Sequence, residues 1–245
     1  MPSALSIKIG DLLYKHAFPV YNIVYPVFKN RQDKQEILLL KKYIKSGDIV
    51  LDIGANIGFY TKILSELVGP TGKVYAFEPD KTNFTYLQRN AGHLKNVELI
   101  NKAVSDKTDT ITLYKSDLLN VDHKTYATQN YTSTSVIDCI KADDVVDGRK
   151  VNFIKIDIQG YEYYAFQGMQ EILKTNNELK IISEFYPFGI QESGVSLVDF
   201  FNCLTSNNFN IFLCESDKLT PFKMEDISTY ENLGKYVYFN LCLIK

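Results

Sequence analysis

The residues Asp48–Gly58, DIVLDIGANIG, decide the fold of this 245-residue chain. Their first part, Asp48–Ile53, is a short run of mostly β-branched and apolar residues that predicts a buried strand. After Gly58, apolar residues recur at helical spacing until Gly69 and Pro70, which predicts a helix and its end. A glycine turn between a strand and a helix lets the backbone approach a ligand, and the helix N-terminus favours anionic groups. The segment is therefore expected to be the first βα unit of the fold and a ligand site.

The same alternation of strands and helices continues along the chain, which predicts an α/β fold around a parallel sheet. Further strands are expected at Lys73–Phe77, Val97–Val104, Thr110–Tyr114, Val151–Asp157 and Lys180–Phe185. Helices are expected after an Asp80 N-cap and after the strand Val151–Asp157, the second one with Tyr161, Tyr164, Ala165, Gly168, Ile172 and Leu173. Near the C-terminus, Asn210–Leu213 and Tyr236–Ile244 are expected to pair as antiparallel strands that close the sheet. The polar stretch Ser116–Thr134 predicts a long loop, and loops of that length inside compact domains are often functional.

The first 46 residues differ from the rest, because aromatic residues and two prolines are mixed with lysines there. One helix is expected from Ser3 to Ala17 and another from Asp33 to Lys45. We therefore divide the chain into an N-terminal helical and aromatic extension, residues 1–46, and a main domain, residues 47–245. The extension has four open interpretations: a weak membrane-surface contact, a substrate lid, a dimer contact, or packing over the edge of the sheet, which is favoured.

Composition and charge exclude several classes of protein. With 45% hydrophobic residues the chain has enough apolar area to fold, which excludes disorder as its main state. The net charge of -2 argues against a nucleic-acid partner, since phosphate neutralisation usually needs a basic excess. The four cysteines have no metal-binding or disulfide spacing, and no signal peptide or transmembrane run is evident. A cytoplasmic protein is expected, and the oligomeric state is left open.

The turn after the first strand favours one nucleoside cofactor over another. A dinucleotide fingerprint reads G-x-G-x-x-G, whereas Gly54 and Gly58 are spaced G-x-x-x-G with Asn56 between them. Without a pyrophosphate to cradle, a loop needs fewer glycines. Asp52 stands two residues before the first glycine, where it suits a ligand that carries a cationic amine. These features fit S-adenosylmethionine (SAM) better than NAD, so an NAD-type oxidoreductase on a related fold is the less favoured alternative.

A second acidic residue strengthens the case for a nucleoside cofactor. Glu78 follows the strand Lys73–Phe77, where a carboxylate can accept hydrogen bonds from both ribose hydroxyls. Either acidic residue alone would be a weak signal, because strand ends often carry solvated carboxylates. Together, on consecutive βα units, they predict a cofactor site outside the carboxyl ends of the strands.

Four stretches together resemble the FkbM family of SAM-dependent methyltransferases: DIVLDIGANIGFYT, VYAFEPD, VELINKAVSD and FIKIDIQGYE. The resemblance runs from about Gln35 to the C-terminus, with most weight on Gly47–Glu162. It implies a three-layer, Rossmann-like class I methyltransferase sandwich, with a seven-stranded, mostly parallel sheet and an antiparallel last strand. It also implies a SAM cofactor and O-methylation of a hydroxyl on a sugar, glycan or natural product.

The resemblance also implies which residues bind the cofactor. Carried over position by position, these are Asp52, Gly54, Ala55, Asn56, Gly58, Glu78, Pro79, Ala103, Val104 and Asp157. Among them Glu78 matches the ribose ligand, and Ala103 and Val104 match the segment beside the adenine. One departure concerns the family pattern K-x-D-x-E-G-x-E, which here has Gln159 in place of the first glutamate. Because glutamine cannot take up a proton, a SAM-binding protein without catalytic activity is a further alternative.

A hydroxyl acceptor must lose its proton when it is methylated, so a base or a metal ion is useful. Three carboxylates lie at or just beyond the carboxyl ends of strands, and we rank Asp157 first as the catalytic base, then Glu184, then Glu162. No metal site is predicted, although a carboxylate pair on neighbouring strands leaves Mg²⁺ as a less favoured alternative. The polar loop Ser116–Thr134 is expected to cover the acceptor pocket, with His123 as a candidate substrate contact. The expected acceptor is a small molecule or a saccharide.

Overall fold

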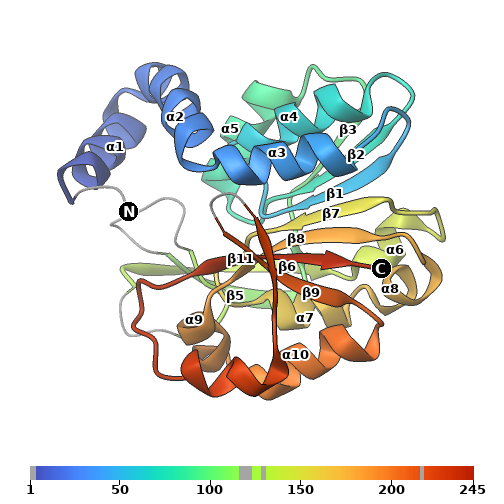
Figure 1. Cartoon of the computed structure of the whole chain (residues 1–245). Coiled ribbons are helices and arrows are strands. Elements are labelled where there is room, and N and C mark those ends of the chain that lie inside the picture. Colours follow the sequence, from blue (N-terminus) through green and yellow to red (C-terminus); the bar gives the residue numbers. More distant parts are fainter. Residues whose placement is uncertain (1–3, 116–122, 128–130, 216–217) are drawn as a thin grey trace.

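The computed structural model describes residues 4–115, 123–127, 131–215 and 218–245 of the chain. Its main feature is an eight-stranded sheet in the order β10-β9-β11-β8-β7-β1-β2-β3 (Figure 1). A second sheet of three strands has the order β4-β6-β5. The strands are β1 Ile49–Ile53, β2 Lys73–Phe77, β3 Val97–Ile100, β4 Ala103–Val104, β5 Asp109–Lys115, β6 Ser133–Ile140, β7 Phe153–Ile156, β8 Lys180–Phe185, β9 Asn210–Cys214, β10 Leu219–Pro221 and β11 Phe239–Ile244.

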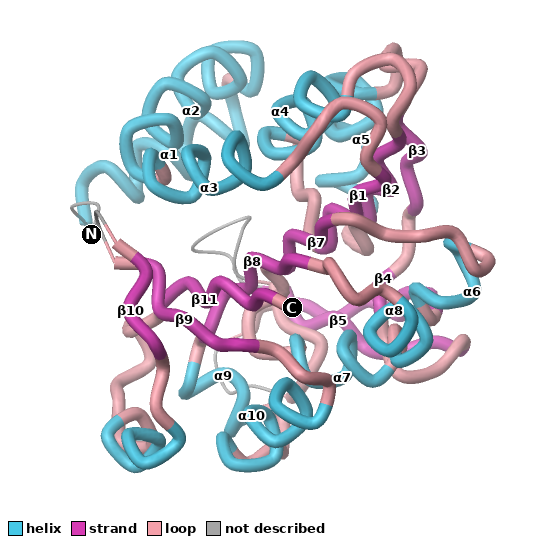
Figure 2. Tube along the Cα trace, turned by 45° about the vertical axis from the view of Figure 1, so that its right-hand side comes forward, coloured by secondary structure: helices cyan, strands magenta, loops and turns pink. Residues whose placement is uncertain are grey.

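Helices cover both faces of the large sheet, so that the fold has three layers. In both views α3, α4 and α5 lie on one side of the sheet, and α7, α8 and α10 lie on the other (Figures 1 and 2). The helices are α1 Ala4–His16, α2 Phe18–Gln32, α3 Lys34–Tyr43, α4 Phe59–Val68, α5 Lys81–Ala91, α6 Ala142–Val146, α7 Glu162–Gln167, α8 Gln170–Thr175, α9 Pro187–Glu192 and α10 Leu197–Ser206, with a 3₁₀ helix at Met224–Thr229.

The central strands are apolar because both of their faces are buried. Successive side chains of a strand point to opposite faces, and Val50 packs in the cluster with α3 and α4 while Leu51 packs in the cluster with α7 and α8. This explains why Asp48–Ile53 is a nearly continuous apolar run rather than an alternating one. It also means that Asp52, on the same face as Val50, is fully buried.

The topology predicts a ligand site next to β1, where the order in which strands are added to the sheet reverses. Strands β3, β2, β1, β7 and β8 run parallel, and β11 lies antiparallel between β8 and β9. From β1 the chain first builds β2 and β3 on one side and later returns to build β7 on the other side. In open α/β sheets, ligands bind outside the carboxyl ends of the strands at such a switch point. The expected antiparallel pairing of the two C-terminal segments is confirmed.

Two expectations about strands are corrected. The large sheet has eight strands rather than seven, because the chain turns back after β9 and Leu219 pairs with Cys214 to form β10. The expected strand Val97–Val104 is two strands: β3 ends at Ile100, and β4 pairs with β6 in the second sheet. The side chain of Asn101 donates hydrogen bonds to the carbonyl oxygens of Glu78 and Pro79, 2.8 and 3.2 Å away, where the chain leaves the large sheet.

The N-terminal residues form three helices instead of the two expected. Helix α2 was not expected because it contains Pro19 and Pro26, but Pro19 lies in its first turn, where proline is tolerated. The aromatic side chains of Tyr14 and Tyr21 pack with Ile57, which lies within the glycine turn between Gly54 and Gly58. The extension therefore packs over the carboxyl ends of the central strands and not only over an edge of the sheet. Within the described residues, no helix combines the length and the apolar character needed to cross a membrane.

Candidate functional site

The turn between β1 and α4 is held in its shape by its two glycines. Both Gly54 and Gly58 have a φ of +90°, in the left-handed region that favours glycine. A side chain on Gly54 would place its Cβ 2.0 Å from the carbonyl oxygen of Asp157. The turn after β1 is therefore in direct backbone contact with the segment after β7. The backbone N–H groups of Gly54 and Ala55 also donate to the Phe77 carbonyl, 3.0 and 2.9 Å away, which fixes the turn to the end of β2.

Asp52 lies beneath this turn with one carboxylate oxygen unused. Its Oδ2 accepts a hydrogen bond of 2.6 Å from the Thr61 hydroxyl, and its Oδ1 is buried without a hydrogen-bond partner among the described residues. Burial raises the pKa of Asp52, and the nearby Lys155 ammonium opposes this shift. A buried carboxylate oxygen without a donor is unfavourable by itself. The unused acceptor oxygen of Asp52 therefore fits a ligand that brings an ammonium group or another hydrogen-bond donor.

Glu78 lies at the end of β2 and faces the same turn. Its carboxylate accepts hydrogen bonds from the backbone N–H groups of Asn56, 2.9 Å, and Asp80, 2.8 Å. Burial raises the pKa of Glu78 to about 8, and these two backbone donors only partly offset the burial. Each carboxylate oxygen can accept more than one hydrogen bond, so the group can still receive two hydroxyl donors. Asp52 and Glu78 therefore lie at the ends of the neighbouring strands β1 and β2, and Glu78 is hydrogen-bonded to the glycine turn.

The remaining cofactor candidates lie along the same edge. Pro79 follows Glu78 directly, and its carbonyl accepts from Asn101, a residue that the sequence analysis did not single out. Ala103 and Val104 are buried in β4, just beyond the end of β3, and pair with Cys139 and Ile140 of β6. The signal for Asn101 was hidden because Val97–Val104 was interpreted as one strand.

On the other side of the turn, two carboxylates share one glutamine side chain. Nε2 of Gln159 donates to Asp157 Oδ1, 3.1 Å, and to Glu184 Oε2, 2.8 Å. Burial and the neighbouring Asp157 and Glu162 carboxylates raise the pKa of Glu184 well above its usual value. Burial would also raise the pKa of Asp157, but the Lys155 and Lys29 ammonium groups outweigh it and hold that pKa below its usual value. The environment therefore favours the charged form of Asp157 and the neutral form of Glu184.

Access separates the three candidate bases. The Asp157 side chain is 35% exposed, whereas Glu184 is 8% exposed and Glu162 is fully buried. Oε1 of Glu162 accepts hydrogen bonds of 3.2 Å from the backbone N–H groups of Ile158 and Gly160. Burial raises the pKa of Glu162 to about 7. Asp157 is therefore in contact with solvent, whereas Glu162 is buried and hydrogen-bonded to the backbone that follows Asp157.

The buried Lys155 connects Asp157 to the N-terminal helices. Lys155 Nζ lies 3.4 Å from Asp157 Oδ2 and 3.7 Å from Glu36 Oε1 of α3. It also lies 4.2 Å from the centre of the Tyr60 ring. The Tyr60 hydroxyl donates to Asp33 Oδ2, 2.6 Å, and Lys29 of α2 pairs with the same aspartate. Sequence reasoning did not find these groups, since only the four-residue spacing between Lys29 and Asp33 hinted at their pairing.

Part of the predicted long loop also reaches this region. The Tyr126 hydroxyl donates to the Gln159 carbonyl, 2.9 Å, and Lys124 Nζ lies 5.2 Å from the centre of the Tyr186 ring. The loop is shorter than expected, because β6 begins at Ser133. Residues 116–122 and 128–130 lie outside the described part of the chain, so the lid expected there is not tested. Burial lowers the pKa of His123, which lies near Asp80.

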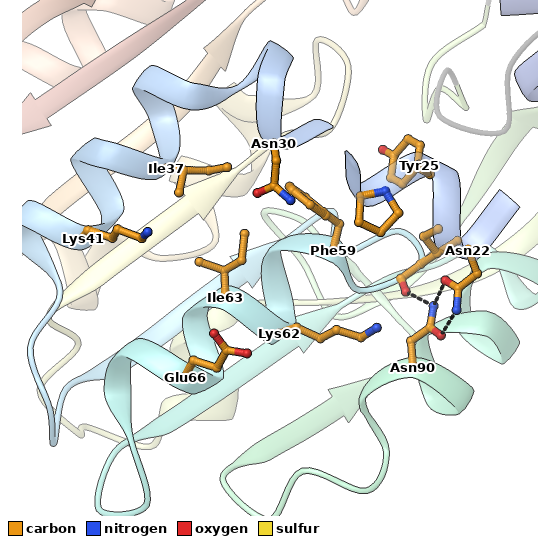
Figure 3. Close-up of a pocket in the computed structure, with 12 residues that line it drawn as sticks. Asn22, Tyr25, Asn30, Ile37, Lys41, Phe59, Lys62, Ile63, Glu66 and Asn90 are labelled. Atoms are coloured by element: carbon orange, nitrogen blue, oxygen red, sulfur yellow. Dashed lines mark hydrogen bonds between the residues drawn. The ribbon is translucent and has the colours of Figure 1, made fainter. Parts of the chain in front are cut away.

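A separate cavity of about 320 Å³ lies between α2, α3 and α4 (Figure 3). Asn22 and Asn90 exchange two amide hydrogen bonds of 2.9 Å at one end of it. Ile57 of the glycine turn lines this cavity, but none of Asp52, Glu78, Asp157, Glu162 and Glu184 does. This cavity therefore lies behind the glycine turn and is not the site of the carboxylates. Within the described ranges, His, Cys, Asp and Glu form no group of three that could hold a metal ion.

Comparison with known proteins agrees with this geometry. The family model described as the methyltransferase FkbM domain matches residues 52–211. The hexuronic acid methyltransferase AglP of Haloferax volcanii is 26% identical over 171 residues, which cover 67% of this chain and 68% of that protein.

Solved structures share the fold at low sequence identity. The methyltransferase FkbM from Methylobacillus flagellatus KT gives a TM-score of 0.50 at 20% identity and covers 81% of this chain. The match spans 43% of that longer chain, less than half of its length. A Streptococcus mutans protein described as a methyltransferase, in complex with SAH, gives a TM-score of 0.52 at 14% identity, with 87% and 96% of the two chains covered. These likenesses establish a Rossmann-like methyltransferase fold.

Proposed function

The chain belongs to the FkbM methyltransferase family, and from this premise we propose that it transfers the methyl group of SAM to a hydroxyl group of a saccharide. The observation that carries the proposal is the backbone contact between Gly54 and Asp157. It brings the turn that suits a cofactor against the segment that bears an accessible, ionised carboxylate. A cofactor held at the one and an acceptor held at the other would be neighbours, and positioning is the main requirement of an in-line displacement.

The residues at the cofactor side fit SAM. The unpartnered Oδ1 of Asp52 would accept from the ammonium of the methionine part, and Glu78 would accept from the ribose hydroxyls. Ala55, Asn56 and Gly58 would line the turn, with Pro79, Ala103 and Val104 towards the adenine. SAM supplies the electrophilic methyl group on its sulfonium, so the acceptor oxygen is the atom that needs help from the protein.

Asp157 is the proposed base at the acceptor side. It is ionised because two lysine ammonium groups lie near it, and it has solvent access that Glu184 and Glu162 lack. The proton of the acceptor hydroxyl would pass to Asp157, because the environment of Glu184 disfavours its charged form. Gln159 would hold both carboxyl groups in position through its amide, which needs no proton transfer of its own. Glu162 would fix the backbone of Ile158 and Gly160.

A saccharide is proposed as the acceptor because the hexuronic acid methyltransferase is among the relatives of this chain. Absence of a nucleic-acid partner and a cytoplasmic location stay predictions from the sequence. The test is incubation with SAM and, separately, sugar nucleotides, free glycans and lipid-linked saccharides, with release of SAH and gain of a methyl group on the acceptor as readouts. We expect turnover with at least one saccharide class, and a large loss of that turnover in Asp157→Asn.

The second candidate function is SAM binding without catalysis, which Gln159 favours because the family pattern has a glutamate there. The two functions differ in one measurement. A protein that binds SAM in calorimetry but releases no SAH with any acceptor class, as wild type and as Gln159→Glu, would support the binding function. Activity that appears only in Gln159→Glu would show that the working carboxylate has been replaced in this chain.

A further inference from the structure

The outer sides of α1 and α2 expose a set of large apolar side chains. They are between 41% and 72% exposed, and we call them the apolar stripe: Ile9, Leu12, Val20, Ile23, Val24, Val27 and Phe28. The α2 members are spaced three or four residues apart, so they share one side of that helix. The opposite side of α2 carries Tyr21, which packs in the aromatic cluster against the body of the protein. Exposed apolar side chains gathered in this way mark a binding surface.

The exposed charged side chains of the N-terminal helices have a single sign. Between residues 8 and 45, all exposed Lys, Arg, Asp and Glu side chains are cationic: Lys8, Lys15, Arg31, Lys34, Lys41, Lys42 and Lys45. The three acidic residues of this range, Asp11, Asp33 and Glu36, are only partly exposed, and each lies within 4 Å of a lysine ammonium. Because the whole chain has a net charge of -2, this basic surface is a local feature.

We propose that the apolar stripe and the cations around it bind an anionic lipid surface. Amphipathic helices that lie in a membrane interface combine a large apolar face with Lys and Arg at its borders. Each cation near a negatively charged leaflet adds to the attraction. Two side-chain contacts hold α1 and α2 against α5. The Tyr14 hydroxyl donates to Asn83, 2.6 Å, and Asn22 is hydrogen-bonded to Asn90, 2.9 Å (Figure 3). Their inner sides are thus fixed while their outer sides stay exposed.

A second copy of the chain fits this surface less well. In a twofold dimer the same patch meets itself, so the exposed cations of one copy would face those of the other. Like charges brought together in an interface are unfavourable. No exposed Asp or Glu lies within residues 8–45 to compensate them. The charge pattern therefore favours a negatively charged partner surface.

The test is co-sedimentation of the full chain with vesicles of phosphatidylcholine alone and of phosphatidylcholine mixed with phosphatidylglycerol. We expect binding to the mixed vesicles that weakens as salt is raised. The double variant Ile23→Glu/Val27→Glu should weaken it by roughly tenfold or more, because it places two charges in the buried face. The matched control is Val136→Glu, at a valine of β6 that is 69% exposed, which should bind as the wild type does.

Neutralising Arg31 and Lys34 with the double variant Arg31→Gln/Lys34→Gln should also weaken binding, by roughly tenfold at low salt. Circular dichroism of each variant checks that the fold is kept. Absence of wild-type binding to the mixed vesicles at low salt would overturn the proposal. So would a concentration-dependent dimer in sedimentation velocity that Ile23→Glu/Val27→Glu abolishes, with no vesicle binding, since a second copy would then cover the stripe. None of these readouts depends on methyl transfer.

Discussion

The two halves of the candidate site are built in different ways. The cofactor side takes Asp52, the glycine turn and Glu78 from one continuous βαβ unit, residues 49–77 and the residue after it. The acceptor side collects Asp157, Glu184 and Tyr126 from three distant segments, and the N-terminal helices add Lys29 and Glu36 around Lys155. The first half is local in sequence, and the second depends on how the whole chain packs.

The two halves also differ in their electrostatics, although Lys155 lies near acids of both. The cofactor side holds two buried acids with raised pKa values and no ion pair on Glu78 among the described residues. The acceptor side holds its acids beside two lysines, so that one of them, Asp157, is ionised. The predictions below test whether the two halves are as separate as the geometry indicates.

The largest effect is expected at Asp157. We expect Asp157→Asn to lower kcat by about 10²–10⁴-fold, because it removes the proposed general base. SAM affinity, measured by calorimetry, should be unchanged if the halves are separate. A parallel loss of SAM affinity would instead assign Asp157 to the cofactor, and full activity in Asp157→Asn together with a large gain in Gln159→Glu would refute the base assignment.

Lys155 is expected to have the next largest effect, on stability. Lys155→Met leaves Asp157, Glu36 and Asp52 without their shared cation, and breaking a buried pair in this way costs about 3–5 kcal/mol. Urea unfolding at neutral pH measures this loss. The difference from wild type should shrink as pH falls, because protonated carboxyl groups no longer need the cation.

The matched control for Lys155 is Lys73→Met. Lys73 pairs with Glu98 at 3.1 Å, but both side chains are substantially exposed, so its loss should cost no more than about 1 kcal/mol. A Lys155→Met penalty that is the same at neutral and acidic pH would show that packing, and not charge, is the main contribution of Lys155.

At Glu78 the expected effect is on cofactor binding and its pH dependence. Glu78→Gln should raise the Kd for SAM about tenfold or more, since a carboxylate acceptor for the ribose hydroxyls is lost. With a pKa of about 8, Glu78 is mostly protonated at neutral pH in the free protein. Binding that needs the carboxylate should therefore release close to one proton at neutral pH. Affinity should rise with pH up to about 8 and then level off.

The sign of the stability effect is opposite to that of binding. A carboxyl group with a raised folded-state pKa binds its proton more tightly when folded, so the free protein loses stability as pH rises from 4.5 towards 8. Calorimetry in buffers of different ionisation enthalpy measures the proton release, and Glu78→Gln should abolish it. Glu98→Gln on β3, which is largely exposed, is the control and should leave it intact. Unchanged proton release in Glu78→Gln would move the titration to another group.

The smallest effect is expected where the N-terminal helices meet the cofactor side. Tyr14→Phe removes the hydrogen bond to the buried Asn83, and its loss should cost about 1 kcal/mol in urea unfolding. Tyr25→Phe, in the same aromatic cluster but nearer to Lys29, serves as a comparison. If Tyr14→Phe also weakens SAM binding, the extension belongs functionally to the cofactor half, and the boundary at residue 46 is misplaced for function.

Local patterns explain which parts of the site were predictable. Asp52, Gly54 and Glu78 were found because each has a fixed position relative to one strand, and strands β2 and β8 have the predicted bounds. Asp157 and Glu184 were found by the same rule of strand ends. Their relation through Gln159 was not, because it depends on a residue with a φ of +58° that turns its side chain back between them.

The missed features each depend on structural context that a local sequence pattern does not contain. Helix α2 was missed because prolines usually end helices, and the position of Pro19 in a first turn is visible only once the helix boundary is known. Strand β6 was missed because its polar Ser and Thr residues look like a loop, although Ile137 and Cys139 alternate into a small core. Lys155 is the lysine of the family pattern K-x-D-x-E-G-x-E, but its role as a buried cation was missed, because its partner Glu36 lies more than a hundred residues away in the sequence.

The two edge strands of the large sheet affect whether a strand of another chain can pair with it. An open edge presents unpaired N–H and C=O groups that another strand can join, which is a route to aggregation. Here one edge is β10, three residues that end in Pro221, and the other is β3, four residues that carry the charged Glu98. Short edges, a proline and a charge each discourage strand addition. The extra eighth strand therefore covers β9, a longer strand of five residues, and leaves a poor template at the border of the sheet.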